Sequence, residues 1–191
     1  MNDEKESICL ENKEKKETKQ GLIKARSIFL SGHIDEKTAK TVIESLLQLE
    51  SESPLEDVFF YIDSYGGYID SMFAIIDTMN LVHPDINTIC IGKAMSAAVV
   101  VLSSGAKGKR FITPNGKTMI HQVFAHAFGP ANYIEIEAED IKKDQQRMER
   151  LLAKNTGQSM KTIKDDVAIM KYMNAEESVL YGLVDAVKKR R

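Results

Sequence analysis

The fold of this chain is decided by the segment Gly92-Lys93-Ala94-Met95-Ser96-Ala97-Ala98-Val99-Val100-Val101-Leu102. The apolar residues 86–91 before it are typical of a buried strand, and the small and branched residues after Ser96 are typical of a buried helix. Ser96 would then lie in a tight strand-to-helix turn, with its hydroxyl near the partial positive charge of a helix N-terminus. Serine nucleophiles are held in such turns within Gly-x-Ser-x-Gly motifs, but alanines replace both glycines here. The alternative interpretation is that Ser96 caps a core helix.

Length and composition indicate one globular domain behind a charged N-terminal tail. Of the 191 residues, 43% are hydrophobic, which is enough for a substantial core. Residues 1–20 are mostly charged, so we expect a mobile tail there. A single domain is expected over residues 21–191.

Several classes of partner and location are disfavoured by the same data. A formal net charge of −2 provides no basic surface for nucleic acid. Cys9 and Cys90 are too few for a disulfide framework, which favours a reducing compartment. No apolar run reaches the length of a membrane span, and residues 1–5 are too polar for a signal peptide. We therefore expect a cytoplasmic protein with neither a nucleic-acid nor a membrane partner.

Strand and helix patterns alternate through the first half of the chain. Apolar runs predict strands at residues 27–30, 58–62 and 86–91, and Asp35 is a candidate N-cap for the helix after the first of them. Apolar residues at helical spacing predict the intervening helices: Ala39, Val42, Ile43, Leu46 and Leu47, then Ile69, Met72, Phe73, Ile76 and Met79. This order predicts an α/β fold with a mainly parallel sheet and right-handed crossovers.

The second half contains two short predicted strands, at residues 109–113 and 118–121, and a long predicted helix from Asn132 to about Asn155. Apolar residues form a stripe along this helix that Gln145 interrupts: Ile134, Ala138, Ile141, Met148 and Leu152. Such a stripe packs either against a helix of a neighbouring subunit or against the core of its own domain. A shorter helix is expected at residues 160–166.

Three sites of chemical interest follow predicted strands: Gly66-Gly67, Ser96 and His121. Functional sites of open α/β sheets assemble at strand ends. Paired glycines let backbone N–H groups approach a reacting carbonyl, as an oxyanion hole requires, and a histidine can activate a serine nucleophile. Together the three favour acyl-transfer chemistry, although each alone has a structural explanation as a turn, a helix cap or a strand-end histidine.

Over roughly residues 22–187 the chain resembles the proteolytic subunit of the ATP-dependent Clp protease (ClpP). The resemblance rests on six segments in the same order: Phe60-Tyr61-Ile62-Asp63-Ser64-Tyr65-Gly66-Gly67, Ile86-Asn87-Thr88-Ile89-Cys90-Ile91-Gly92, Gly105-Ala106-Lys107-Gly108-Lys109-Arg110-Phe111, Met119-Ile120-His121-Gln122, Thr156-Gly157-Gln158-Ser159 and Tyr181-Gly182-Leu183-Val184-Asp185. It implies an α/β fold, the ClpP/crotonase-like ββα superhelix, with a protruding handle helix that starts at Asn132.

The resemblance also implies a function. It implies a serine endopeptidase in stacked seven-membered rings, to which AAA+ unfoldases deliver unfolded polypeptide. Ser96 would be the nucleophile, His121 the general base and acid, and the N–H groups of Gly67 and Ala97 the oxyanion hole. No cofactor is implied for this chain, because the unfoldase consumes the ATP and the chain lacks a phosphate-binding Gly-x-x-x-x-Gly-Lys-Ser/Thr loop. Its four histidines show no metal-ligand spacing with Cys or acidic residues.

The chain departs from the family pattern at the position of the triad aspartate, where Met170 stands. The charged pair just before it is replaced by Ala168 and Ile169. Asp166, one helical turn earlier, is a candidate substitute carboxylate. Smaller departures are Ala98 after the oxyanion position, Tyr65 and Val123 where proline is usual, and Lys16 and Lys19 in place of aromatic residues of the first helix.

Two other hypotheses follow from these departures and from the fold. The first is a catalytically degenerate subunit with a structural or regulatory role in a mixed ring with an active paralogue. The second is a crotonase-type acyl-CoA enzyme, which shares the architecture and the backbone oxyanion hole. The set of collinear motifs argues against the second.

Overall fold

The computed structural model describes residue 21 and residues 25–189. The expected tail at residues 1–20, with Cys9, Lys16 and Lys19, therefore lies outside the described residues. The strands are β1 (Ser27–Ile34), β2 (Val58–Gly67), β3 (Ile86–Met95), β4 (Arg110–Ile112), β5 (Lys117–Ile120), β6 (Lys171–Met173) and β7 (Ala186–Val187). The helices are α2 (Glu36–Glu52), α3 (Ile69–Leu81), α4 (Ala97–Ser103), α5 (Ala131–Thr156), α6 (Met160–Ala168) and α7 (Ala175–Tyr181).

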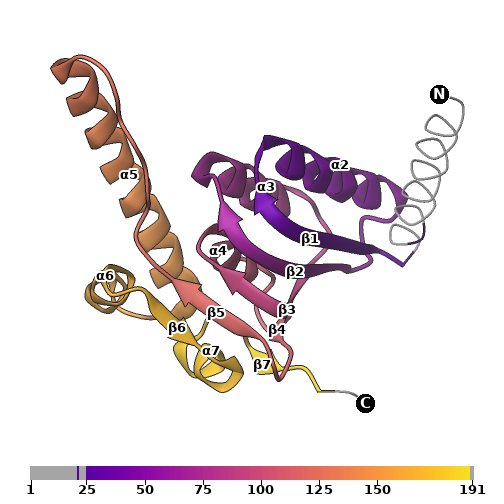
Figure 1. Ribbon diagram of the computed structural model, residues 1–191. Helices are drawn as coiled ribbons and strands as arrows, with labels where there is room; N and C mark the ends of the chain where they lie inside the picture. The colour runs from indigo at the N-terminus through magenta and orange to yellow at the C-terminus, as the bar shows by residue number, and fades with distance from the viewer. Residues whose placement is uncertain (1–20, 22–24, 190–191) are drawn as a thin grey trace, which may run out of the picture.

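The strands form one mixed sheet dominated by parallel pairs. Its main path runs β1-β2-β3-β4-β7, and every pair along it is parallel. β5 runs parallel to the carboxyl-terminal part of β3, and β6 pairs antiparallel with β5. α2 packs against β1, α4 packs against β2 and β3, and α3 lies between the two helices (Figure 1). The fold is α/β, as the alternating pattern predicted, and it is consistent with the ClpP architecture.

The first three strands extend several residues beyond the apolar runs that predicted them. The extensions are paired: Ile34 of β1 lies beside Gly67 of β2, and Met95 of β3 lies beside Met119 of β5. The strands are longer than predicted because backbone pairing with a neighbouring strand continues past the last residue of each apolar run. As a result, Gly66-Gly67 closes a strand instead of forming a separate loop.

The helix expected from Asn132 begins one residue earlier, and its two halves have different surroundings. Near its carboxyl end Met148 and Leu152 are buried, and this half contacts α4 and α6. Near its amino end Ile134 and Ile136 are exposed, and Figure 1 shows this half projecting away from the sheet. The apolar stripe therefore joins the intramolecular core in one half only.

A buried ion pair fixes the base of α5 to the sheet. Arg110 is 2% exposed, and its guanidinium bonds the Asp185 carboxylate, with Nη2 2.6 Å from Oδ1. The same guanidinium donates to the carbonyl of Ser103 in α4 and to that of Asn155 in α5. One side chain thus ties the end of α5 to α4 and to the segment just before β7.

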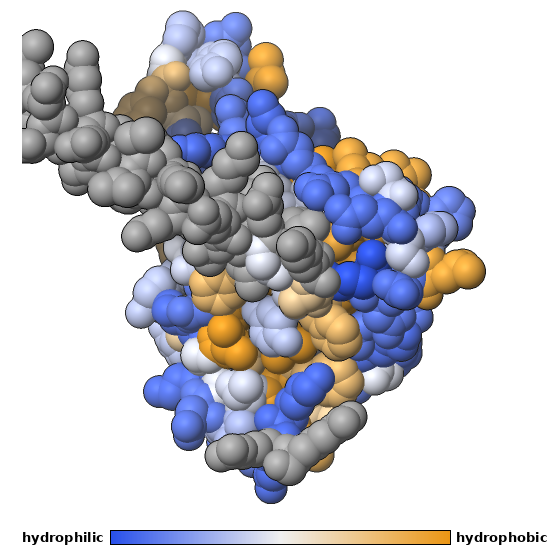
Figure 2. All heavy atoms as spheres, turned by 90° about the vertical axis from the view of Figure 1, so that its right-hand side faces the viewer, coloured by the Kyte–Doolittle hydropathy of each residue, from blue (hydrophilic) through white to orange (hydrophobic). Residues whose placement is uncertain are grey.

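The surface seen in Figure 2 carries a central group of apolar side chains with hydrophilic residues around it. The large apolar side chains that are exposed include Phe29 at 47% and Tyr65 at 70%. None of the helices in the described part of the chain is both long and apolar enough to cross a membrane.

Candidate functional site

One cavity of about 670 Å³ brings together all four residues that the sequence pointed to as a site. It is lined by Gly67, Ser96, Ala97 and His121, which come from β2, the β3–α4 turn, the start of α4 and the residue after β5. Its remaining walls come mainly from the start of α3, the segment after His121 and the inner side of α5. The elements converge because parallel strands end at the same edge of the sheet.

Ser96 occupies a strained turn between β3 and α4. Its backbone has φ 54° and ψ −128°, a conformation that costs a non-glycine residue about 1–3 kcal/mol. The turn is held by a hydrogen bond from Ser96 N–H to the Met119 carbonyl, 2.9 Å long, and by α4, whose residues are all buried. Ser96 is at the N-cap position, but its hydroxyl makes no capping hydrogen bond. The helix-cap interpretation of this side chain is therefore wrong.

The paired glycines are required by close packing. Gly66 has φ 103°, and a Cβ there would lie 2.7 Å from Ser96 Cβ and 2.9 Å from Ala97 N. A Cβ on Gly67 would lie 2.2 Å from the Ile34 carbonyl oxygen in β1. The absence of side chains lets the end of β2 approach the Ser96 turn, which places the backbone of Gly67 and Ala97 on one cavity.

His121 is half-buried, and its ring centroid lies 5.0 Å from that of Phe124. Burial lowers the pKa of His121 below its ordinary value, against a smaller opposing effect of a backbone group of Gln122. Its Nδ1 atom is buried and has no hydrogen-bond partner among the described residues. A base that is neutral near pH 7 suits proton transfer, but nothing here orients the imidazole from its Nδ1 side.

Met170 stands where the family resemblance implies a carboxylate that would orient that imidazole. Ile120 pairs with Lys171 and Met119 with Tyr172 in the antiparallel β5–β6 ladder. The ladder ends at the Ile120–Lys171 pair, and His121 and Met170 are the residues that adjoin this pair. Met170 is 41% exposed at φ 56°, and its thioether sulfur accepts a hydrogen bond from the Tyr172 hydroxyl at 3.8 Å. The Met170 side chain therefore supplies no charge next to the end of this ladder.

Asp166 does not replace the missing carboxylate in this structure. It is 9% exposed, and its two oxygens accept hydrogen bonds from Tyr181 Oη at 2.8 Å and from Lys171 Nζ at 2.9 Å. Burial raises the pKa of Tyr181, and the hydrogen bond to Asp166 and the negative charge of that carboxylate raise it further. Since His121 Nδ1 has no partner within the described ranges, the hypothesis of rescue by Asp166 is not supported by the contacts.

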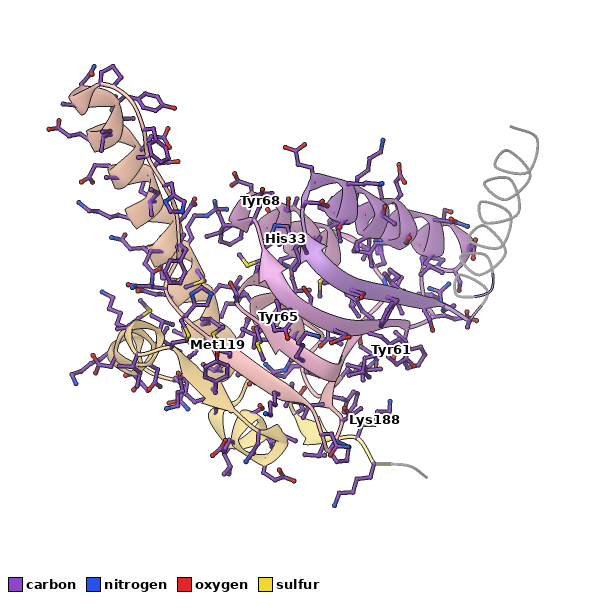
Figure 3. All side chains as sticks on the ribbon, in the orientation of Figure 1. His33, Tyr61, Tyr65, Tyr68, Met119 and Lys188 are labelled. Carbon is purple, nitrogen blue, oxygen red and sulfur yellow. The ribbon has the colours of Figure 1, made fainter. Side chains whose placement is uncertain are left out.

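Sequence reasoning did not identify several residues around the cavity. Tyr68 lines it, and its ring meets that of His33 edge-on at 5.0 Å, as the two labelled side chains in Figure 3 show. Asp144 of α5 also lines it, and burial raises the pKa of that carboxyl, helped by the nearby Asp70 and Asp140. Neither residue carries a signal in a single sequence, because both reach the cavity only through the packing of α3 and α5.

Other groups are less suited to chemistry. Cys90 is fully buried, and burial raises the pKa of its thiol to about 12, so it cannot act as a nucleophile near neutral pH. Among residue 21 and residues 25–189, no group of three or more His, Cys, Asp or Glu side chains is placed to hold a metal ion.

The fold and the cavity together define an α/β protein with a candidate acyl-transfer site at the carboxyl ends of its parallel strands. The sequence model of the Clp protease family matches residues 11–191, so the chain belongs to this family. Membership implies peptidase activity in general terms, and proteins of the family generally form rings and work with Clp unfoldases.

Proposed function

We propose that this chain is a serine endopeptidase subunit of an ATP-dependent Clp protease. In this mechanism Ser96 Oγ attacks the scissile carbonyl of the substrate while the His121 imidazole takes the hydroxyl proton. The N–H groups of Gly67 and Ala97 stabilise the oxyanion. His121 then protonates the leaving amine, and water hydrolyses the acyl-enzyme by the same route.

The observation that carries this proposal is the Ser96 turn. A non-glycine residue at φ 54° costs stability, and the hydroxyl does not compensate by capping α4. Strain of this kind is retained where the side chain has a task, and this hydroxyl shares a cavity with His121 and the two proposed oxyanion donors.

Activity of the isolated chain is expected to be weak, because His121 Nδ1 lacks a carboxylate partner among the described residues. In triad serine proteases, loss of that partner's charge lowers kcat about 10⁴-fold. The same observation favours a second candidate function, a structural or regulatory subunit in a ring with an active paralogue. Retention of the Ser96 turn favours the first candidate.

The proposed partners follow from the family. Identical or paralogous subunits would form seven-membered rings, and two rings would interlock through the exposed half of α5, in which Ile134 is 41% and Ile136 65% exposed. An AAA+ unfoldase would consume ATP and deliver unfolded polypeptide in the cytoplasm.

Hydrolysis of a fluorogenic peptide and of a labelled unfolded protein tests the proposal. The full-length chain and Ser96→Ala are each assayed alone and mixed with an inactive-serine variant of a ClpP paralogue from the same organism. Turnover that disappears with Ser96→Ala supports a peptidase. No turnover in either setting, from folded and oligomeric protein, leaves the structural role.

A further inference from the structure

Gln145, which interrupts the apolar stripe of α5, makes a specific contact inside the molecule. Its Oε1 atom accepts a hydrogen bond from Val123 N–H at 2.7 Å. Its Nε2 atom donates to Glu149 Oε1, also at 2.7 Å. Glu149 lies one helical turn further along α5 and is only 5% exposed. The interruption of the stripe is therefore a polar relay from a buried carboxylate to a backbone amide.

The chemistry of the three groups fixes the direction of this relay. A carboxylate only accepts hydrogen bonds and a backbone N–H only donates them. The Gln145 amide must therefore turn its nitrogen to Glu149 and its oxygen to Val123. Burying a carboxylate without a hydrogen-bond partner costs free energy. The buried Glu149 therefore favours the Gln145 side-chain orientation that donates a hydrogen bond to it.

The relay ends two residues beyond His121, in the irregular segment 121–130. The amide before it is also held, because Gln122 N–H donates to the Val167 carbonyl of α6 at 3.1 Å. Two consecutive amides after His121 are thus attached to two different helices. Since His121 Nδ1 has no partner among the described residues, this backbone attachment acts together with the Phe124 ring contact to orient the imidazole.

We propose that Gln145 and Glu149 are positioning residues, which hold the His121 imidazole in place through the Val123 amide. This inference deepens the proposed function and depends on it for its catalytic consequence. The relay substitutes in part for the orienting carboxylate that Met170 replaces. It also makes the position of the general base depend on the position of α5.

Peptide hydrolysis by relay variants tests the proposal. Gln145→Ala removes both hydrogen bonds, and Gln145→Glu sets two carboxylates side by side. The exchange variant Gln145→Glu/Glu149→Gln restores both bonds, with a carboxylate accepting from Val123 N–H and an amide donating to it. Gln146→Ala, at an exposed neighbouring position of the same helix, is the matched control.

We expect Gln145→Ala and Gln145→Glu to lower kcat about 10-fold or more while KM stays within about twofold, because a base displaced by about 1 Å loses rate and not binding. The kcat of the exchange variant should return to within about threefold of the parental value, and the kcat of Gln146→Ala should equal the parental value. Equal loss in Gln146→Ala, or no recovery in an exchange variant that folds with the parental Tm, would overturn the proposal.

A second measurement reads the imidazole itself and needs no turnover. Hydrogen–deuterium exchange at the imidazole C2 carbon, followed by mass spectrometry, gives the pKa and exposure of each histidine in an assembly of any size. Gln145→Ala should speed exchange at His121 and move its pKa towards the ordinary value, whereas His83, with a side chain 79% exposed, should not change. An unchanged His121 would overturn the proposal. An inactive parent whose His121 still responds would instead contradict the proposed function and leave the positioning role standing.

Discussion

The turns at Ser96 and Met170 both hold a non-glycine residue at positive φ, 54° and 56°, but their surroundings differ. Ser96 is enclosed by Gly66, by the Met119 carbonyl and by a fully buried helix. Met170 is 41% exposed beside Ile169, which is 73% exposed. The first turn brings the Ser96 side chain to the cavity that His121 also lines. The second adjoins the last pair of the β5–β6 ladder, near His121 in sequence register, and carries no charged side chain.

The largest expected effect comes from returning a carboxylate to the second turn. Met170→Asp should raise kcat/KM for peptide hydrolysis by about 10²-fold or more, up to the roughly 10⁴-fold that this carboxylate contributes in triad proteases. Aspartate also tolerates positive φ better than methionine, so the fold should not suffer.

The matched control is Met170→Asn, which has the same size and backbone preference but no charge. It should gain at most a few-fold, because a neutral amide does not stabilise the imidazolium. Equal gains in the two variants would show that the effect is conformational, and no gain in either would mean that position 170 does not reach His121.

A methyl group added at Gly66, which packs against the Ser96 turn, should disrupt that turn. Gly66→Ala would set a Cβ 2.7 Å from Ser96 Cβ and 2.8 Å from the Met95 carbonyl oxygen, at φ 103°. We expect a loss of about 2–4 kcal/mol in the free energy of unfolding, together with loss of peptidase activity. Gly108→Ala is the control, since Gly108 has φ 82° with nothing within 4 Å. It should lose about 1–2 kcal/mol, the cost of the left-handed backbone alone. Similar losses of Tm in both variants would contradict the packing argument.

A smaller effect is expected from Asp166, and on stability only. Asp166→Ala leaves the buried Tyr181 hydroxyl and Lys171 without their partner, which should cost about 1–3 kcal/mol. Hydrolysis below the melting transition should change by less than about threefold, as should that of Tyr181→Phe. Loss of activity in Asp166→Ala but not in Tyr181→Phe would show that Asp166 serves as the triad carboxylate after all.

The smallest effect is a shift in pH dependence. Burial lowers the pKa of His121, and a general base works only in its neutral form. The acidic limb of kcat/KM should therefore have its midpoint below the ordinary histidine value of about 6.5. In Met170→Asp the new carboxylate favours the imidazolium, so the midpoint should move to higher pH, and in Met170→Asn it should not. A limb above about 6.5 in the parent would contradict the burial of His121.

The sequence was informative wherever local chemistry decides the structure. Asp35 caps α2 as expected, because the Asx side chain and the Thr38 amide are neighbours in the chain. The helical spacing of Ile69, Met72 and Phe73 placed α3 correctly for the same reason. The meeting of Gly67, Ser96 and His121 on one cavity followed from the parallel order of the strands. Their catalytic roles remain predictions.

What the sequence could not give depends on partners far along the chain. β6 is only three residues long, and it exists because β5 supplies its hydrogen bonds. Gly66-Gly67 lies within a strand because β1 extends beside it. In the sequence, Gln145 only interrupts an apolar stripe. The structure shows that its side chain accepts a hydrogen bond from the Val123 amide, which is 22 residues away in the chain. Contacts between segments that are distant in the sequence leave no recognisable pattern in either segment alone.

The central claim is that Ser96 is a working nucleophile although Met170 supplies no carboxylate. Covalent labelling of Ser96 tests this claim most directly. The full-length protein is treated with a fluorophosphonate probe and read by intact mass, beside Ser96→Ala and Met170→Asp. We predict a single adduct in the parent, a faster one in Met170→Asp and none in Ser96→Ala. No adduct in the parent or in Met170→Asp, from protein shown to be folded and oligomeric, would contradict the account and leave the Ser96 turn without a catalytic role.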